Sequence, residues 1–470
     1  MNKGYAEHVE RELRRIFAGK KIIVVGGPVA GLTALARQLR SLGAARPFVI
    51  GSSMGLGTPP TKEEAEWCSL ELSAKSVNDS LRGYERRLLH PPDEVRARVD
   101  AWDPERQAIA LGAIILGEVA TVCGRPRFGA RPRDWIALED KTRIDEVWDA
   151  LGVARAPSEI VRLDKAALLA AARRLDSGAG TVWAADARDG VHGGAEKLYH
   201  VRSEAEADDA LALLSGEVDR VRVMPFLKGV PCSIHGIVTP EGVAVFRPVE
   251  LVTLRRPDSG RFVYAGVATF WDPEPRDREA MREVGRVVGA GIAERIGFRG
   301  AFTVDGVMTR DGFMPTELNP RIGAGIGVLG QSIEAVPLTL LAIAAQAGQA
   351  LDFRTALLEA EVVAAADASR RGGAWCVVPT PLEARPELLL AAEGDGYRVA
   401  GPDDEVVGRI SVGPSDVGGF VRFTPSPAHT PVGKPIAPRA VSAFGLADRE
   451  LGTGLGELLV AVGAGPRQAP

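Results

Sequence analysis

Two carboxylates and an amide stand close together in residues 302–321, FTVDGVMTRDGFMPTELNPR. Asp305 lies in one strand-like run, and Glu317 and Asn319 lie in the next. Mg²⁺ prefers oxygen ligands of this kind and is commonly shared with phosphates. Arg321 follows two residues later and could clamp a phosphoryl oxygen. The pattern predicts chemistry at a magnesium-bound phosphate, while the spacing alone leaves open a solvated hairpin with scattered charges.

The two runs must pair as a hairpin if these side chains are to meet. A three-residue loop at 310–312, with its glycine in the left-handed position, places Asp305 directly opposite Glu317. Their Cβ atoms would then be ~5 Å apart on one face of the hairpin. Asn319 points to the same face because side chains alternate along a strand. A two-residue loop would instead place Asp305 opposite Leu318, so the site depends on the register.

Residues 303–325, TVDGVMTRDGFMPTELNPRIGAG, resemble the signature of ATP-grasp ligases. That signature has a metal-binding acid on one strand, Glu-x-Asn-x-Arg on the next, and a glycine-rich segment after it. The resemblance implies that Asp305, Glu317 and Asn319 hold one or two Mg²⁺ ions, for which Mn²⁺ could substitute. It also implies that ATP is the co-substrate and that Arg321 is catalytic, stabilising charge on the transferred phosphoryl group.

ATP-grasp enzymes hold ATP between two subdomains, so further elements should precede the hairpin. Residues 139–141 resemble the family's Asp-Lys element, which implies that Lys141 reaches the nucleotide phosphates. An ordinary capped helix is the alternative. Residues 185–201 resemble the glycine-rich loop that closes over the phosphates, although Ala184 and Ala185 stand where many members carry a second phosphate lysine. The residues assigned to phosphate binding in this loop are Gly190, His192, Gly193, Gly194 and Lys197.

Residues 223–227, VMPFL, resemble the hinge between the two subdomains, whose backbone binds adenine. Packing in the core is the alternative for these side chains, and the acid that often contacts the ribose in the family is missing. Arg255 and Arg256 are candidates for binding the substrate carboxylate or are parts of a solvated basic loop. The residues assigned to the adenine pocket are Met224, Pro225, Phe226 and Leu227.

The whole chain resembles peptide ligases of the pheganomycin biosynthesis type, through residues 134–153, 182–197 and 432–452. The resemblance implies that an unusual amino acid, of an amidino- or guanidino-phenylglycine type, is activated as an acyl-phosphate. The N-terminal amine of a peptide then accepts it, and ADP and phosphate are released, in antibiotic biosynthesis. A dipeptide or amino-acid ligase with a small amine acceptor is the alternative within the family.

Residues 22–35, IIVVGGPVAGLTAL, predict a buried strand, a glycine-rich turn and a helix. A dinucleotide fingerprint needs a middle glycine so that the backbone can approach the pyrophosphate, and Pro28 occupies that position. No acid follows the second strand to bind a ribose hydroxyl. A flavin- or NAD-dependent oxidoreductase is therefore the alternative from another class, and the segment better fits the small βαβ domain that precedes many ATP-grasp cores.

The expected fold class is α/β and α+β, in three parts. Residues 1–133 form a pre-ATP-grasp, Rossmann-like βαβ domain. Residues 134–350 form the two-subdomain ATP-grasp core, whose smaller nucleotide-covering subdomain spans about 140–222. Residues 351–470 form a small β-rich C-terminal domain closed by a helix near 450–462. Other helices are expected at 140–151 and 278–296.

Composition limits the partners. The 470 residues carry a net charge of −4, so no global positive field favours nucleic acid. The four cysteines form no CxxC pair, which argues against a zinc site or a disulfide scaffold. The N-terminus has no apolar run, and the longest apolar stretch, 335–347, is too short to span a membrane. We expect a cytoplasmic enzyme and leave a homodimer open.

Overall fold

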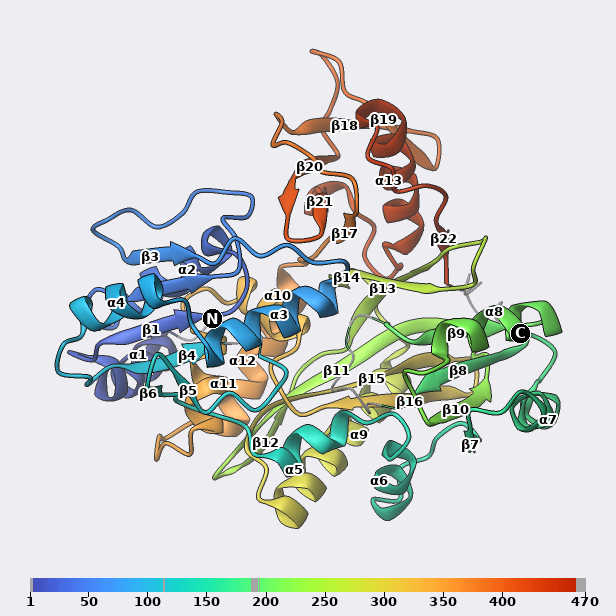
Figure 1. Ribbon diagram of the computed structural model, residues 1–470, viewed down its shortest axis with the longest axis horizontal. Helices are drawn as coiled ribbons and strands as arrows, with labels where there is room; N and C mark the ends of the chain where they lie inside the picture. The colour runs from blue at the N-terminus through green and yellow to red at the C-terminus, as the bar shows by residue number, and fades with distance from the viewer. Residues whose placement is uncertain (1–2, 113–114, 187–192, 194, 462–470) are drawn as a thin grey trace.

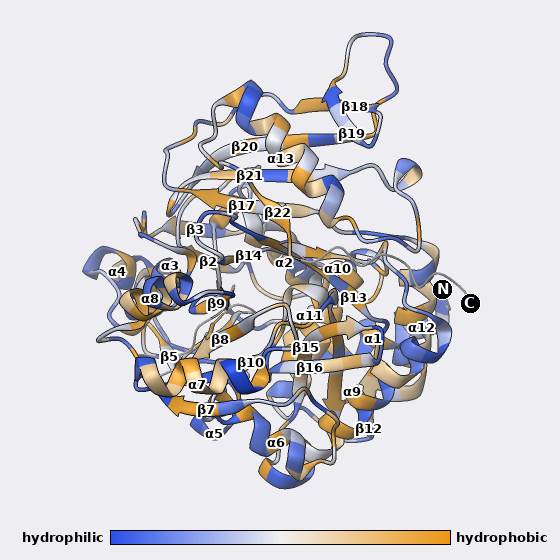
Figure 2. Cartoon of the chain, turned by 90° about the vertical axis from the view of Figure 1, so that its right-hand side faces the viewer, coloured by the Kyte–Doolittle hydropathy of each residue, from blue (hydrophilic) through white to orange (hydrophobic). Residues whose placement is uncertain are grey.

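The computed structural model describes residues 3–112, 115–186, 193 and 195–461. Four sheets of four or more strands follow one another in these residues, and Figure 1 shows helices packed around them. Peripheral helices such as α7 carry both apolar and polar residues, as expected for helices with one face on a core (Figure 2). Within the described residues, no helix combines the length and the apolar character needed to cross a membrane.

The N-terminal sheet is parallel, and its order confirms the predicted βαβ opening. Strand β1 is completely buried, as the apolar run predicts for a strand covered on both faces. The strand order is β3 (Glu66–Ser69), β2 (Phe48–Gly51), β1 (Ile22–Val25) and β4 (Ile109–Gly112). The surrounding elements are α1 (Lys3–Phe17), α2 (Val29–Ser41), α3 (Val77–Leu89), α4 (Asp93–Trp102) and the small ribbon β5 (Thr121–Val122) with β6 (Arg125–Pro126).

The turn between β1 and α2 is closed to a dinucleotide. The amide of Val29 donates to the carbonyl of Ser53 at 2.9 Å, and the amide of Ala30 donates to that of Met54 at 3.1 Å. A Rossmann fold would offer the amides at this helix start to a pyrophosphate. Because the amides of Val29 and Ala30 already have protein partners, the structure argues against an oxidoreductase that binds flavin or NAD at this turn.

The second sheet is antiparallel and lies at the position of the expected nucleotide-covering subdomain. Its order is β7 (Glu159–Arg162), β10 (Arg220–Pro225), β8 (Thr181–Ala185) and β9 (Leu198–Val201), with α7 (Lys165–Leu175) and α8 (Glu204–Leu214). Before it come α5 (Arg133–Ile136), the 3-10 turn η1 (Ala137–Glu139) and α6 (Ile144–Ala150). The helix predicted at 140–151 is shorter, because the Asp140 carboxylate accepts from the Thr142 amide at 2.9 Å and forms a turn.

The central sheet carries the predicted hairpin. Its order is β14 (Phe262–Ala268), β13 (Val249–Arg255), β11 (Gly229–Thr239), β15 (Gly300–Thr309) and β16 (Gly312–Asn319), with β12 (Gly242–Val245) beside β11 and β22 (Leu459–Val460) beside β13. The predicted helix at 278–296 is present as α9 (Pro275–Ile296), and its stripe of Met281, Val288 and Ile292 is buried. The other helices of this part are α10 (Ala324–Gln331), α11 (Leu338–Gln346) and α12 (Thr355–Ala368).

The C-terminal sheet is antiparallel, and α13 (Ala437–Leu451) covers one face of it. Its order is β17 (Ala374–Val378), β21 (Gly418–Pro425), β20 (Gly408–Ser415), β18 (Leu388–Glu393) and β19 (Gly396–Val399), and the 3-10 turn η2 (Pro427–His429) follows β21. The helix predicted near 450–462 is wrong. The helix ends at Leu451 because Gly452 takes the left-handed conformation, with φ of 61°.

Glu250 joins the central sheet to this C-terminal helix. Its carboxylate accepts hydrogen bonds from the amides of Ile436 at 2.7 Å and Ala437 at 2.9 Å, at the start of α13. The side chain is almost completely buried. Burial raises the pKa of Glu250 to about 7, although the two amides act in the opposite direction.

We therefore expect Glu250 to make stability pH-dependent. The folded state holds the proton more tightly than the unfolded state, so stability falls as pH rises from about 4.5 to about 7. The full loss is up to about 3 kcal/mol. Glu250→Gln removes the ionisation and costs one hydrogen bond at every pH. Denaturant unfolding of both proteins at pH 5 and pH 8 should show the wild type losing stability relative to the variant, and equal changes would contradict the assignment.

Candidate functional site

The β15–β16 hairpin brings the two predicted carboxylates face to face. Asp305 pairs with Glu317 in the register of the strands, as the sequence predicts. The predicted three-residue loop is wrong, because Thr309 pairs with Gly312 across a two-residue turn. The turn consists of residues 310 and 311 and would by itself leave Asp305 opposite Thr316; the Leu318 pairing would need a two-residue loop one position later. A β-bulge between the two pairs restores the expected register.

The bulge has local and distant causes. Pro315 has no amide hydrogen, so a complete ladder cannot continue through it. The Thr316 hydroxyl donates to the carbonyl of Asp305 at 3.2 Å. From β10, the buried guanidinium of Arg222 donates to the carbonyl of Thr316 at 3.1 Å and binds the carboxylate of Asp145 with its other nitrogens. Arg222 therefore fixes the distortion that aligns the two acids.

The environment of Asp305 favours a cation beside it. One carboxylate oxygen, Oδ2, accepts from the Asn319 amide at 2.8 Å, while the buried Oδ1 has no hydrogen-bond partner among the described residues. Burial raises the pKa of Asp305, and the facing Glu317 carboxylate raises it further. Arg321, the Ser233 hydroxyl and Lys141 act in the opposite direction. Asp305 thus has an unpartnered oxygen and faces a second acid. A divalent ion bound here would bind that oxygen and offset the repulsion between the two carboxylates.

Cations from two other segments reach the same place. The buried amine of Lys141 lies 3.4 Å from the Glu317 carboxylate. Arg321 donates from Nη2 to the Asn319 amide oxygen at 3.0 Å and from Nε to the Glu139 carboxylate at 3.0 Å. The structure thus brings together all five residues predicted around the metal and the phosphates, namely Lys141, Asp305, Glu317, Asn319 and Arg321.

Two of the residues that hold Arg321 in place had no assigned role in the sequence interpretation. Glu139 is completely buried and accepts from Arg321 on one oxygen and from Arg131 on the other, at 2.5 Å. Burial alone would favour its neutral form, but Arg321 and Arg131 lower the pKa of Glu139. Arg131 also donates to the carbonyl of Pro320 at 3.3 Å. Glu139 lies in the quoted Asp-Lys element, whereas Arg131 had no sequence signal.

The donor set suits magnesium rather than zinc. Two carboxylates and an amide oxygen are hard ligands, and the remaining positions would fall to phosphate oxygens or water. The described residues contain no group of three or more His, Cys, Asp or Glu side chains that could hold a metal by themselves. The four cysteines are free and buried.

The predicted adenine residues form a small apolar cluster at the end of β10. Met224 is buried with Ala156 and Val182, and Phe226 and Leu227 pack against them. The Phe226 amide donates to the carbonyl of Gly180 at 3.0 Å, while Pro225 pairs with Thr181 in the sheet. Leu227 also belongs to the predicted hinge, and its amide makes no backbone hydrogen bond among the described residues. Adenine binding by this hinge stays a prediction.

Only part of the predicted phosphate loop is described. Gly190, His192 and Gly194 lie outside the described residues. Gly193 lies beside the site, since a Cβ there would be 4.0 Å from a guanidinium nitrogen of Arg321. The Asn78 side chain pairs with the Gly193 backbone, donating to its carbonyl at 2.8 Å and accepting from its amide at 3.1 Å.

Three predicted basic residues point elsewhere. Lys197 pairs with Glu217 at 3.1 Å. Arg255 donates to the ring of His200 at 3.1 Å, and Arg256 donates to the carbonyl of Leu455 at 2.8 Å. The structure does not bring these side chains together with the Asp305 group through any contact among the described residues. Their roles in phosphate and carboxylate binding stay predictions.

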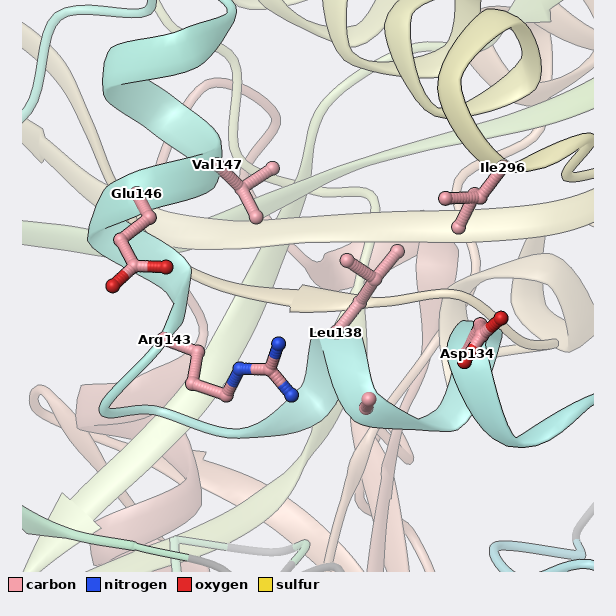
Figure 3. Close-up of a pocket in the computed structure, with 7 residues that line it drawn as sticks. Asp134, Leu138, Arg143, Glu146, Val147 and Ile296 are labelled. Atoms are coloured by element: carbon pink, nitrogen blue, oxygen red, sulfur yellow. The ribbon is translucent and has the colours of Figure 1, made fainter.

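Two cavities among the described residues are separate from this site. One, of about 250 Å³, lies between α6, η1 and the end of α9 (Figure 3). The other, of about 380 Å³, lies between the end of α12 and the segment after β21. Neither cavity is lined by the carboxylate pair or by Arg321. The candidate site is therefore defined by its side-chain chemistry and not by cavity size.

Solved structures share this arrangement of sheets. The biotin carboxylase domain of 2-oxoglutarate carboxylase from Hydrogenobacter thermophilus matches with a TM-score of 0.54 and 17% identity, over 87% of this chain and 86% of that chain. Biotin carboxylase from Campylobacter jejuni matches with a TM-score of 0.52 and 13% identity, over 86% and 87%. The chain has the ATP-grasp fold.

The ATP-grasp fold is also found in phosphoribosylamine–glycine ligase from Thermotoga maritima, which matches with a TM-score of 0.50 and 16% identity, over 91% of this chain and 96% of that chain. At the sequence level, no family model matches the chain and no curated protein is detectably similar to it. These structural matches establish the fold class that the sequence predicts. At identities this low, they establish nothing finer.

Proposed function

We propose that this protein is an ATP- and magnesium-dependent ligase that joins a carboxylate to an amine through an acyl-phosphate. The observation that carries the proposal is the hairpin site, where the unpartnered Oδ1 of Asp305 lies between Glu317, Asn319 and Arg321. The fold supports the proposal. The Hydrogenobacter structure of the same fold contains MgADP and bicarbonate, and the Campylobacter structure is a complex with beta-gamma-ATP.

In this proposal the side chains bind and neutralise charge. Asp305, Glu317 and Asn319 would hold magnesium, which when bound neutralises charge on the phosphates. Lys141 would bind a phosphate oxygen once nucleotide is present, and Arg321 would stabilise the transferred phosphoryl group. Glu139 keeps Arg321 oriented through their 3.0 Å ion pair.

The reaction needs two displacements. A carboxylate oxygen attacks the γ-phosphorus of ATP and ADP leaves, forming the acyl-phosphate. The amine then attacks the acyl carbon, phosphate leaves and the nitrogen loses a proton. No serine or cysteine nucleophile is required. Water must be kept out because it would hydrolyse the intermediate. Gly193, whose carbonyl accepts from Asn78, would help to exclude it in this proposal.

At a finer level, we propose a peptide ligase of natural-product biosynthesis that activates an unusual amino acid and uses the N-terminal amine of a peptide as acceptor. The resemblance of three sequence segments to pheganomycin-type ligases supports this assignment. A ligase with a small amine acceptor is the second candidate. The Hydrogenobacter domain is described as a dimer, and a homodimer is part of the proposal.

The nucleotide products test the chemistry. Turnover with ATP, Mg²⁺ and a panel of acids and amines should yield ADP and phosphate in equal amounts, because the γ-phosphoryl group is the one transferred. Chromatography of the nucleotides and a phosphate assay would measure both. Detection of AMP and pyrophosphate would sink the proposal, since these products signal an adenylate.

A further inference from the structure

An aromatic strip joins the central sheet to the C-terminal sheet. Tyr264 of β14 meets Trp375 of β17 edge to face, with ring centroids 6.1 Å apart. Trp375 stacks on Phe420 of β21 at 6.0 Å and 29°. All three side chains are only partly buried. We name Tyr264, Trp375 and Phe420 the aromatic strip.

One end of the strip is Tyr264, on β14 of the sheet that also carries the β15–β16 hairpin. Burial raises the pKa of Tyr264, the Asp305 carboxylate raises it further, and Arg321 lowers it. The Tyr264 hydroxyl therefore lies within electrostatic range of both site residues. Gly266, at a bulge in β14, allows Gly373 to approach closely just before β17. A Cβ on Gly266, where φ is 120°, would lie 2.7 Å from the carbonyl oxygen of Gly373.

The other end lies on the face of the C-terminal sheet opposite α13. Trp375 pairs in register with Arg422, so Trp375, Phe420 and Arg422 share one face. The alternate residues Cys376 and Val421 are buried in the cluster that includes α13, on the opposite face. Figure 1 shows β17 close to β14, with β20 and β21 above it in the C-terminal part of the chain.

Three donors along the strip have no protein partner. The Tyr264 hydroxyl, the Trp375 indole nitrogen and the Arg422 guanidinium make no hydrogen bond or ion pair among the described residues, and Arg422 is exposed. Leu56, in the loop after β2, packs on Gly413 next to Phe420 and borders the face. Aromatic surface with a few unsatisfied polar groups is typical of a ligand site.

We propose that the aromatic strip and Arg422 bind the amine-bearing substrate, a short peptide whose aromatic side chain packs on Trp375 and Phe420 and whose C-terminal carboxylate pairs with Arg422. This inference rests on the proposed ligase function. The spacing agrees with it, because ring centroids about 6 Å apart match the ~6.6 Å that two residues of extended chain span.

Charge assigns the strip to the acceptor. The acid that is activated must place its carboxylate beside Arg321 and the γ-phosphate. Such an acid has no second carboxylate for Arg422 to bind. A peptide acceptor places its amine at the Tyr264 end and still carries a carboxylate two or three residues away.

The probe is the tripeptide Gly-Gly-Phe, compared with its C-terminal amide and with Gly-Gly-Leu. Calorimetric titration into the full chain with Mg²⁺ and ADP gives each Kd. We expect Arg422→Gln to weaken Gly-Gly-Phe about tenfold and to leave the amide unchanged, as loss of one charge-assisted contact predicts. Trp375→Leu or Phe420→Leu should weaken Gly-Gly-Phe several-fold more than Gly-Gly-Leu.

The controls separate this inference from the proposed function. Arg449→Gln removes another exposed arginine of the C-terminal part, on α13, and should leave every Kd unchanged. Arg422→Lys should retain part of the preference for the free carboxylate. Equal weakening of acid and amide by Arg422→Gln, or no binding of Gly-Gly-Phe to the wild type, would overturn the inference. ADP-forming ligation by the same preparation would then leave the proposed function standing.

Discussion

Replacing Glu317 by glutamine should lower turnover at least ~10²-fold while leaving the fold intact, an effect comparable to the loss of one electrostatic stabiliser in an active site. The substitution keeps the size of the side chain and removes the charge that faces Asp305. It also removes the ion partner of the Lys141 amine. Steady-state rates at saturating ATP and Mg²⁺ would measure the loss.

A variant of the same hairpin provides the control. Asp311→Asn removes one carboxylate at the exposed turn, away from the site, and should leave turnover unchanged. Matching melting temperatures for both variants and the wild type would show that folding is not the cause. A folded Glu317→Gln protein with near-normal activity would refute the hairpin as the metal site.

Acetylating the N-terminus of a peptide acceptor should abolish product, whereas amidating its C-terminus should still permit ligation. Only the activated partner contributes a carboxylate in the proposed chemistry, and the acceptor contributes its amine. Arg321 and the magnesium that Asp305, Glu317 and Asn319 would hold can accept one small carboxylate beside the γ-phosphate, whereas a peptide would have to thread its C-terminus into the same place. Mass spectrometry of the products would distinguish the cases.

The result for the amidated peptide also bears on Arg422. If Arg422 binds the acceptor carboxylate, the amide should be ligated with a higher KM and a similar kcat. Ligation of acetylated peptides with no reaction of amidated ones would show that the peptide is the activated acid. The two substrates would then be assigned in reverse, although the ligase chemistry would stand.

Local patterns predicted the elements that carry the site. The apolar run of β1, the stripe of α9 and the two runs of the hairpin have periods that a short window of sequence reveals. The pairing of Asp305 with Glu317 was predicted for a reason that proved incomplete. The turn is one residue shorter than expected, and the bulge next to Pro315 restores the register.

The sequence by itself determined the proposed chemistry, because Asp305, Glu317, Asn319 and Arg321 lie within one short segment. Their order and spacing can be recognised without any distant partner. Only the tertiary structure decided how that chemistry is held. Glu139 meets Arg321 across 182 residues, and Arg222 meets Thr316 across 94. The aromatic strip likewise joins two sheets. Such contacts depend on how whole sheets pack, and no local period or propensity encodes which distant side chain will lie opposite.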